Sequence, residues 1–188
     1  MAVNFSQSSS SSSPPIDALS RILIVTASFF AIAALALIIV GTVTTSWYYI
    51  DDTSGNTQNY NLFTYCSGNK LNGSSTCVDM PRQTALGIGT LNAAAVLVVG
   101  ICLLGCGMLV TIAMNFVQLT GILLFIAPIV LFLASISILI AFVLGSQVTL
   151  YNSYSAILVQ TAHAATIFSA VIIAFASGRL HVRYYQQF

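Results

Sequence analysis

The sequence predicts a membrane all-α four-helix transmembrane bundle with a small extracellular antiparallel β-sheet in its first loop. The bundle is predicted by composition, because the 188 residues are 57% hydrophobic and only 5% charged, whereas a soluble domain carries about 25% charged residues. Positions 83–178 contain no Asp, Glu, Lys or Arg, and no water-soluble surface could be made from them. The sheet is predicted by the polar stretch Trp47–Cys77, which holds the only Trp and two of the four Cys.

Residues 1–20 are expected to form a disordered, serine-rich cytosolic tail. Ser8–Ser13 is an unbroken serine run followed by two prolines, and such a segment buries nothing that could offset its ordering entropy. A cleaved signal peptide is the alternative for the segment that begins at Arg21. However, apolar character continues to Val43, well beyond an h-region of about 7–15 residues. We therefore expect an uncleaved four-span domain over residues 21–183.

Four apolar runs are long enough to cross the hydrocarbon core, which takes about 20 helical residues. Pro128 lies in the third run, where neighbouring helices can satisfy the freed backbone carbonyl. The first loop then covers residues 46–85, the short second loop covers residues 146–154, and a cytosolic C-terminal tail covers residues 184–188. The predicted spans are residues 22–45, 86–112, 119–145 and 155–177.

Charge at the ends of the spans predicts the orientation. Arg21 precedes the first span, and Arg179 and Arg183 follow the fourth. The first loop carries three Asp against Lys70 and Arg82. By the positive-inside rule, both termini are cytosolic and both loops face outward, which predicts a multi-pass plasma-membrane protein.

Alternation in the first loop predicts three short strands and a disulfide. Asn72-Gly73 lies between Cys66 and Cys77, and this dipeptide is a strong hairpin-turn signal. Two Cys in a polar loop that faces an oxidising compartment are expected to pair, and closing this loop stabilises it by about 3 kcal/mol. The expected strands are Trp47–Asp51, Tyr60–Cys66 and Thr76–Asp79.

Two covalent modifications are suggested by local sequence. Asn72-Gly73-Ser74 is a glycosylation acceptor at an exposed turn, so we expect a glycoprotein with Asn72 as the candidate site. Cys102 and Cys106 are four residues apart, share a helix face and fall near the cytosolic end of the second span. They are candidates for palmitoylation, and the alternative is that they are small packing residues.

Polar and small residues within the spans are interpreted as packing features. His163 has no acidic partner in any span, so a neutral, hydrogen-bonded side chain is favoured over a proton relay. Small residues also recur every four positions along the fourth span, which lets another helix approach closely. We interpret this row as packing within the bundle, with a seam between copies as the alternative. It comprises Ala162, Thr166, Ala170, Ala174 and Gly178.

The sequence contains no constellation of catalytic residues. Three of the four Asp lie in one loop with no His near them, and no glycine loop follows a strand in the pattern that binds phosphate. We therefore expect no enzyme activity, no cofactor and no metal. The net charge of +1 implies no nucleic-acid partner, and the expected partners are the lipid bilayer and other membrane proteins.

The first loop resembles the claudin and peripheral myelin protein superfamily. The family pattern is a Trp, then Gly-Leu-Trp, two residues, a Cys and a second Cys. This chain has Trp47, Asn61-Leu62-Phe63, Cys66 and Cys77 at those places, so Asn61 and Phe63 depart from the pattern. The segment Tyr154–Leu158 is similar to the start of the fourth helix in the myelin and calcium-channel-gamma branches.

The resemblance implies a structural membrane protein at cell contacts, adhesive or membrane-organising through its extracellular sheet. Its partners would be like or related four-span proteins, in the same membrane and across cells. Leu150 and Tyr151 in the second loop favour adhesion, because an adhesive protein needs exposed apolar residues at loop tips. The alternative is an auxiliary subunit that modulates a channel or receptor. A transporter is disfavoured because no charged residue enters the spans.

Overall fold

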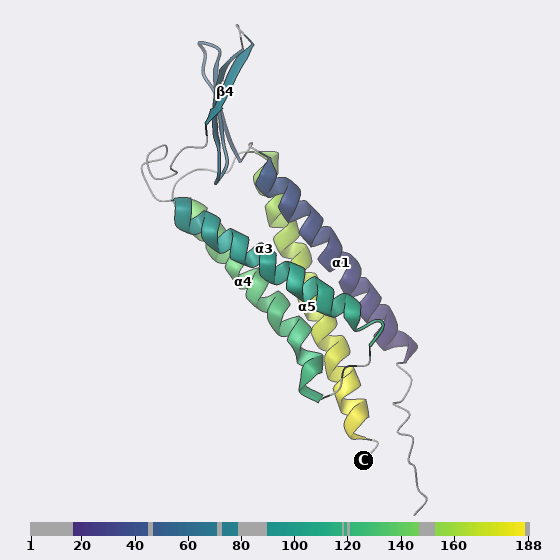
Figure 1. Ribbon diagram of the computed structural model, residues 1–188. Coiled ribbons are helices and arrows are strands. Elements are labelled where there is room, and N and C mark those ends of the chain that lie inside the picture. Colours follow the sequence, from purple (N-terminus) through teal and green to yellow (C-terminus); the bar gives the residue numbers. More distant parts are fainter. Residues whose placement is uncertain are drawn as a thin grey trace, which may run out of the picture.

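The computed structural model describes residues 17–44, 47–70, 73–78, 90–117, 119, 121–146 and 153–186. Four long helices lie side by side, and a four-stranded sheet stands beyond one end of the bundle (Figure 1). All four are apolar and long enough to cross a membrane. The helices are α1 (Ala18–Val43), α3 (Thr90–Ala113), α4 (Ile126–Ser146) and α5 (Tyr154–Tyr185), and a 3-10 turn, η1 (Gly121–Phe125), precedes α4.

The helices agree with the predicted spans in number and order, but several of their ends differ; α4, for example, begins at Ile126 after η1, whereas the predicted third span began at residue 119. α1 begins at Ala18, so the last residues of the predicted tail are helical, while residues 1–16 lie outside the described ranges. α5 continues to Tyr185, whereas the prediction ended the span at Ser177. The end of an apolar run marks the edge of the membrane's hydrocarbon core. A helix makes its own backbone hydrogen bonds, so it can continue past that edge into the polar interface. Pro128 lies in the first turn of α4, directly after η1. The carbonyl of Leu124, four residues before it, accepts instead from Ser177 Oγ of α5 at 2.7 Å, as a neighbouring helix can provide.

Small residues bring the helices close together in the core. α1 packs mainly against α5, and α3 mainly against α4. A Cβ built at Gly107 would lie 2.7 Å from Leu131 Cδ2, so α4 approaches α3 closely here, and a larger residue would require the buried Leu131 side chain to shift. Buried hydroxyls add bonds between helices: Ser169 Oγ donates to Ala27 O at 2.8 Å, a contact that small side chains permit.

His163 and Asn115 also bond across the bundle. The His163 ring nitrogen Nε2 and Ser135 Oγ lie 3.1 Å apart, and Asn115 Nδ2 donates to Ser28 Oγ at 3.2 Å. A half-buried, hydrogen-bonded His163 agrees with the packing interpretation. Each of these polar groups has its partner on a different helix, so the bonds help fix which helices are neighbours.

The sheet is an antiparallel meander in the order β1-β2-β3-β4. The predicted strand Tyr60–Cys66 is wrong, because Asn61–Thr64 is the connection between two strands. The strand Asn56–Tyr60 was not predicted, since its polar sequence lacks apolar alternation. A sheet that stands away from the bundle needs no apolar face toward a core. The strands are β1 (Tyr48–Asp51), β2 (Asn56–Tyr60), β3 (Tyr65–Asn69) and β4 (Ser74–Val78).

Candidate functional site: a disulfide-bonded sheet anchored on the helix ends

The predicted disulfide between Cys66 and Cys77 is confirmed. The two residues are directly opposite each other in the β3–β4 ladder, so the bond fixes the register of this hairpin. Gly73 enters β4 with φ +62°, a left-handed conformation that glycine adopts at little cost. Asn72, the candidate glycosylation site, lies outside the described residues.

A buried group of three residues, which we call the anchor cluster, connects the sheet to the bundle. Trp47, Asn61 and Leu62 are only 3%, 7% and 4% exposed. The Trp47 ring stacks on Phe142 of α4 with 5.9 Å between ring centroids, and its Nε1 donates to Gly41 O at 2.6 Å. The single Trp therefore packs against α4 and hydrogen-bonds α1.

Asn61 connects the end of α1 to the turn between β2 and β3. Its Nδ2 donates to Thr42 O at 3.3 Å and Thr44 O at 3.2 Å. Its Oδ1 accepts from the backbone N–H groups of Phe63, at 2.6 Å, and Thr64, at 2.5 Å. The last carbonyls of a helix have no intrahelical partner, so Asn61 supplies donors that α1 needs. This role was not predicted from the sequence, although an Asn in a short polar turn commonly bonds the backbone two residues on.

The start of α5 closes the anchored end of the bundle. Thr44 Oγ1 donates to Ser155 Oγ at 2.8 Å, and Ser155 is fully buried. A Cβ built at Gly41 would lie 2.6 Å from Val159 Cγ2 and 2.9 Å from Ser155 O. The segment Tyr154–Leu158, noted in the sequence for its resemblance, thus lies against the end of α1.

The far end of the sheet consists of two turns that are bonded to each other. The turn after β1 has Gly55 at φ +80°, and the turn after β3 begins at Lys70. Lys70 N donates to Gly55 O at 2.9 Å, and Lys70 Nζ pairs with the carboxylate of Asp51. These two contacts therefore join the turns at the far end of the sheet.

Charges at this far end are paired or hydrogen-bonded. The Asp51 carboxylate and the Tyr49 hydroxyl raise the pKa of Lys70. The Ser54 hydroxyl, 2.5 Å from Asp52 Oδ2, and the Thr53 backbone N–H lower the pKa of Asp52. The far end is therefore polar, with two carboxylates against one ammonium group, and the ammonium group of Lys70 pairs with Asp51.

The outer strands of the sheet are exposed. All five residues of β4 are exposed, and β4 is an edge strand. The Cys66 and Cys77 Cα atoms are 4.0 Å apart, the close spacing of a non-hydrogen-bonded pair. Hydrogen-bonded and non-hydrogen-bonded pairs alternate along antiparallel strands, so Ser75 and Gly68, two positions further on, also form a non-hydrogen-bonded pair. The backbone N–H of Ser75 therefore points away from β3. An edge of this kind can pair with another strand.

The small-residue row on α5 is only partly a packing face. Ala162, Thr166 and Ala170 are buried, whereas Ala174 is exposed and Gly178 is half-buried. A step of four residues turns about 40° beyond one full helical turn, so the row winds away from the bundle. The buried face continues instead through Ile173, Ala176 and Ser177.

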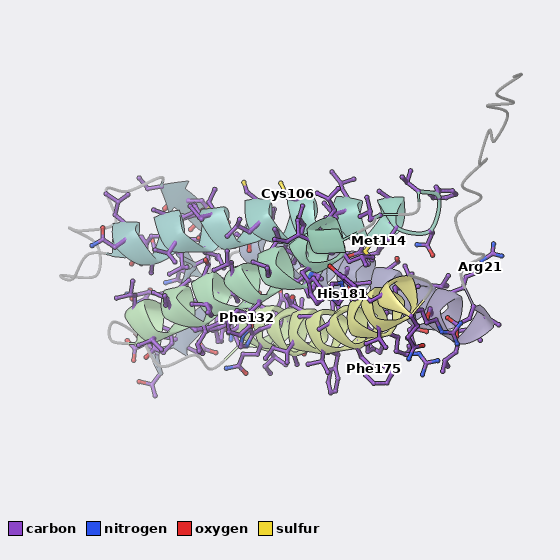
Figure 2. All side chains as sticks on the ribbon, turned by 90° about the horizontal axis from the view of Figure 1, so that it is seen from below. Arg21, Cys106, Met114, Phe132, Phe175 and His181 are labelled. Atoms are coloured by element: carbon purple, nitrogen blue, oxygen red, sulfur yellow. A yellow bond between two sulfur atoms is a disulfide. The ribbon has the colours of Figure 1, made fainter. Side chains whose placement is uncertain are left out.

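The two Cys of the second span are exposed and unpaired on α3. The Cys106 sulfur points away from the other helices (Figure 2). A thiol on the outer surface of a bundle is accessible to acylation. Palmitoylation of Cys102 and Cys106 stays a prediction.

A scan against protein-family models finds no match for this chain, and a search of curated proteins finds none either. The resemblance based on Trp47, Asn61-Leu62-Phe63, Cys66 and Cys77 therefore stays a prediction. The structure shows how these residues are arranged. The disulfide between Cys66 and Cys77 joins two strands, and Trp47 and Asn61-Leu62-Phe63 lie at or beside the base of the sheet.

Proposed function

We propose that this chain is a divergent claudin-like plasma-membrane protein that acts at cell contacts. It would organise the membrane by associating with like or related four-span proteins through its sheet. The observation that carries the proposal is the exposed edge strand β4 on a sheet that is both disulfide-bonded and anchored in the bundle. A rigid edge loses little conformational entropy when it pairs, and pre-organisation of this kind favours binding.

The direction of the strands suggests how copies would associate. The sheet extends the long direction of the bundle beyond its end (Figure 1). The edge of β4 then faces sideways, toward a neighbour in the same membrane, and the two bonded turns face away from the membrane. Edge pairing would therefore act within one membrane, and the turns would meet a second cell.

The exposed side chains of the sheet are better suited to contact another protein than to bind ions. Tyr49, Ile50 and Val78 are large apolar side chains exposed on the edge strands, while Asp51 is already paired with Lys70. Exposed apolar residues contribute the hydrophobic part of an interface, and charges that are already paired contribute little more.

The test is expression in cells that lack junctions, with two differently tagged copies of the full chain. We expect enrichment where cells touch and co-precipitation of the two tags. Ser75→Pro removes the outward N–H of β4, and proline is tolerated at such a position on an edge strand. It should reach the surface with its disulfide formed but lose co-precipitation.

Ser75→Thr is the matched control, because it keeps the N–H and suits a strand. Diffuse surface expression of the wild type, together with a co-purifying channel or receptor, would replace the proposal with the auxiliary-subunit alternative. Equal co-precipitation of the Ser75→Pro variant would show that the β4 edge is not the contact.

A further inference from the structure

A groove of about 570 Å³ runs along the last part of α5, where α1 begins and α5 ends, opposite the sheet (Figure 1). One end of the groove is apolar and the other carries two guanidinium groups. Its apolar lining comes from Ala174, Phe175, Gly178 and Val182, and its charged lining comes from Arg179 and Arg183.

The apolar part of the groove is uncovered. The Phe175 side chain is 58% exposed and points away from the other helices (Figure 2). A Cβ built at Gly178 would meet nothing within 4 Å. In a bilayer, this surface would lie among lipid acyl chains.

The charged end has an excess of positive charge. Asp17 Oδ2 accepts from Arg179 Nη2 at 3.3 Å and from Arg183 Nη2 at 3.1 Å, so one carboxylate faces two guanidinium groups. The Arg183 side chain is 51% exposed. Arg179 Nε is buried and has no hydrogen-bond acceptor among the residues that the structure describes. The exposed parts of these two guanidinium groups, chiefly that of Arg183, can therefore take up one more anionic group, whereas the buried Arg179 Nε cannot contact it directly.

The two ends of the groove match the layers of a bilayer. At about 1.5 Å per residue, the helix from Tyr154 to Gly178 is about 36 Å long, slightly more than the hydrocarbon thickness of about 30 Å. Arg179 and Arg183 then lie at the level of the lipid phosphates. Ala174 and Phe175 lie one turn deeper, among acyl chains.

We propose that this groove binds one phospholipid with an anionic headgroup, with an acyl chain along Ala174 and Gly178 and its headgroup at Arg179 and Arg183. The proposal requires only that α5 crosses a bilayer, and it is independent of the role at cell contacts. A second copy of the chain fits less well. A two-fold contact through the groove is self-complementary and would bring the Arg183 side chains of the two copies together.

Native mass spectrometry tests the proposal on the full chain extracted from mixed vesicles of phosphatidylcholine and phosphatidylserine. Wild-type protein should retain phosphatidylserine in preference to phosphatidylcholine. Because a Cβ at Gly178 meets open space, Gly178→Leu should fill the groove and lose the retained lipid. Gly105→Leu is the matched control, because a Cβ at Gly105 on α3 also meets nothing within 4 Å.

Charge is tested separately from shape. Arg183→Gln should weaken phosphatidylserine retention about fivefold, from about 1 kcal/mol per basic residue near an anionic surface. Arg21→Gln removes an exposed charge outside the groove and should have a smaller effect. Trp47 fluorescence verifies that each variant is folded.

Three results would overturn the proposal. The first is equal retention of phosphatidylcholine and phosphatidylserine by the wild type. The second is full phosphatidylserine retention by a folded Gly178→Leu variant. The third is a wild-type dimer that Gly178→Leu converts to monomer without a change in bound lipid, which would assign the groove to a second copy.

Discussion

At the level of single residues, Asn61 contributes more to the structure than its place in the sequence suggests. Glycine stands at this place in the claudin-like pattern that the loop resembles, and a glycine has no side chain with which to bond two helix carbonyls and two turn N–H groups. Here the side chain connects the end of α1 to the base of the sheet. The asparagine thus introduces hydrogen bonds at the position where sheet and bundle meet.

Replacing Asn61 by Ala should lower the free energy of unfolding by about 1–3 kcal/mol, because buried partners lose their hydrogen bonds. The Trp47 ring, which packs in the same cluster, should become more hydrated and its emission should shift to the red. Thermal unfolding in nanodiscs, followed by the fluorescence of the single Trp, measures both effects. Gln58→Ala on exposed β2 is the control, and an equal effect of the two variants would contradict the role of Asn61.

Asp17 predicts a pH dependence at the opposite end of the bundle. The Ser20 hydroxyl and the guanidinium groups of Arg183 and Arg179 lower the pKa of Asp17 below its ordinary value of 3.8. Because the folded-state pKa is the lower one, the stabilisation is fully present above the ordinary value and is lost as pH falls through the folded value. The melting temperatures of wild type and Asp17→Asn should differ at neutral pH and converge in acid. A difference that stays constant down to strongly acid pH would contradict this account.

At the level of elements, the contact between α1 and α5 depends on Gly41. Gly41→Ala should destabilise the bundle by about 1–3 kcal/mol, as overpacking does in other cores, because its Cβ would overlap Val159 and the Ser155 carbonyl. Gly105→Ala, which meets open space, should leave stability nearly unchanged. Melting temperatures of the two variants in the same nanodisc give the comparison, and equal values would show that the helices are not held at this spacing.

The β3–β4 hairpin should depend on its disulfide. Cys66→Ser or Cys77→Ser should cost about 2–5 kcal/mol and retain the protein inside the cell, whereas Cys102→Ser should leave folding nearly unchanged, because that thiol is exposed and unpaired. Surface biotinylation and thermal unfolding measure the two effects. Normal surface levels of the Cys66→Ser variant would show that the hairpin folds without its bond.

The elements could be predicted to the extent that one strong physical requirement defines each of them. A segment that crosses the hydrocarbon core must be a long uncharged helix, so all four helices could be predicted. The apolar pattern ends at Ser177, but α5 continues to Tyr185, because a helix need not end where the hydrocarbon ends. Strand β2 has no apolar alternation because neither face of the sheet must fill a core. The bonds from Asn61 to Thr42 and Thr44, and the winding of the small-residue row away from the bundle, depend on neighbouring helices, which no local pattern in this chain specifies.

At the level of the whole molecule, the two ends of the bundle differ in chemistry. The sheet and the anchor cluster are at one end, and the Asp17–Arg179–Arg183 ion pairs are at the other. Because α1 begins and α5 ends at the charged end, the positive-inside rule predicts that this end is cytosolic. The sheet would then face outward, as the proposed pairing between cells requires. Orientation is thus the premise on which the proposed function rests.

Thiol labelling of intact cells tests this account most directly. In a background of Cys102→Ser and Cys106→Ser, only the two loop cysteines can react with a membrane-impermeant maleimide. We predict no labelling before reduction, and labelling of intact cells after an impermeant reductant. Labelling before reduction would show that Cys66 and Cys77 are not bonded. Labelling that appears only in permeabilised cells after reduction would place the sheet on the cytosolic side and contradict the role at cell contacts.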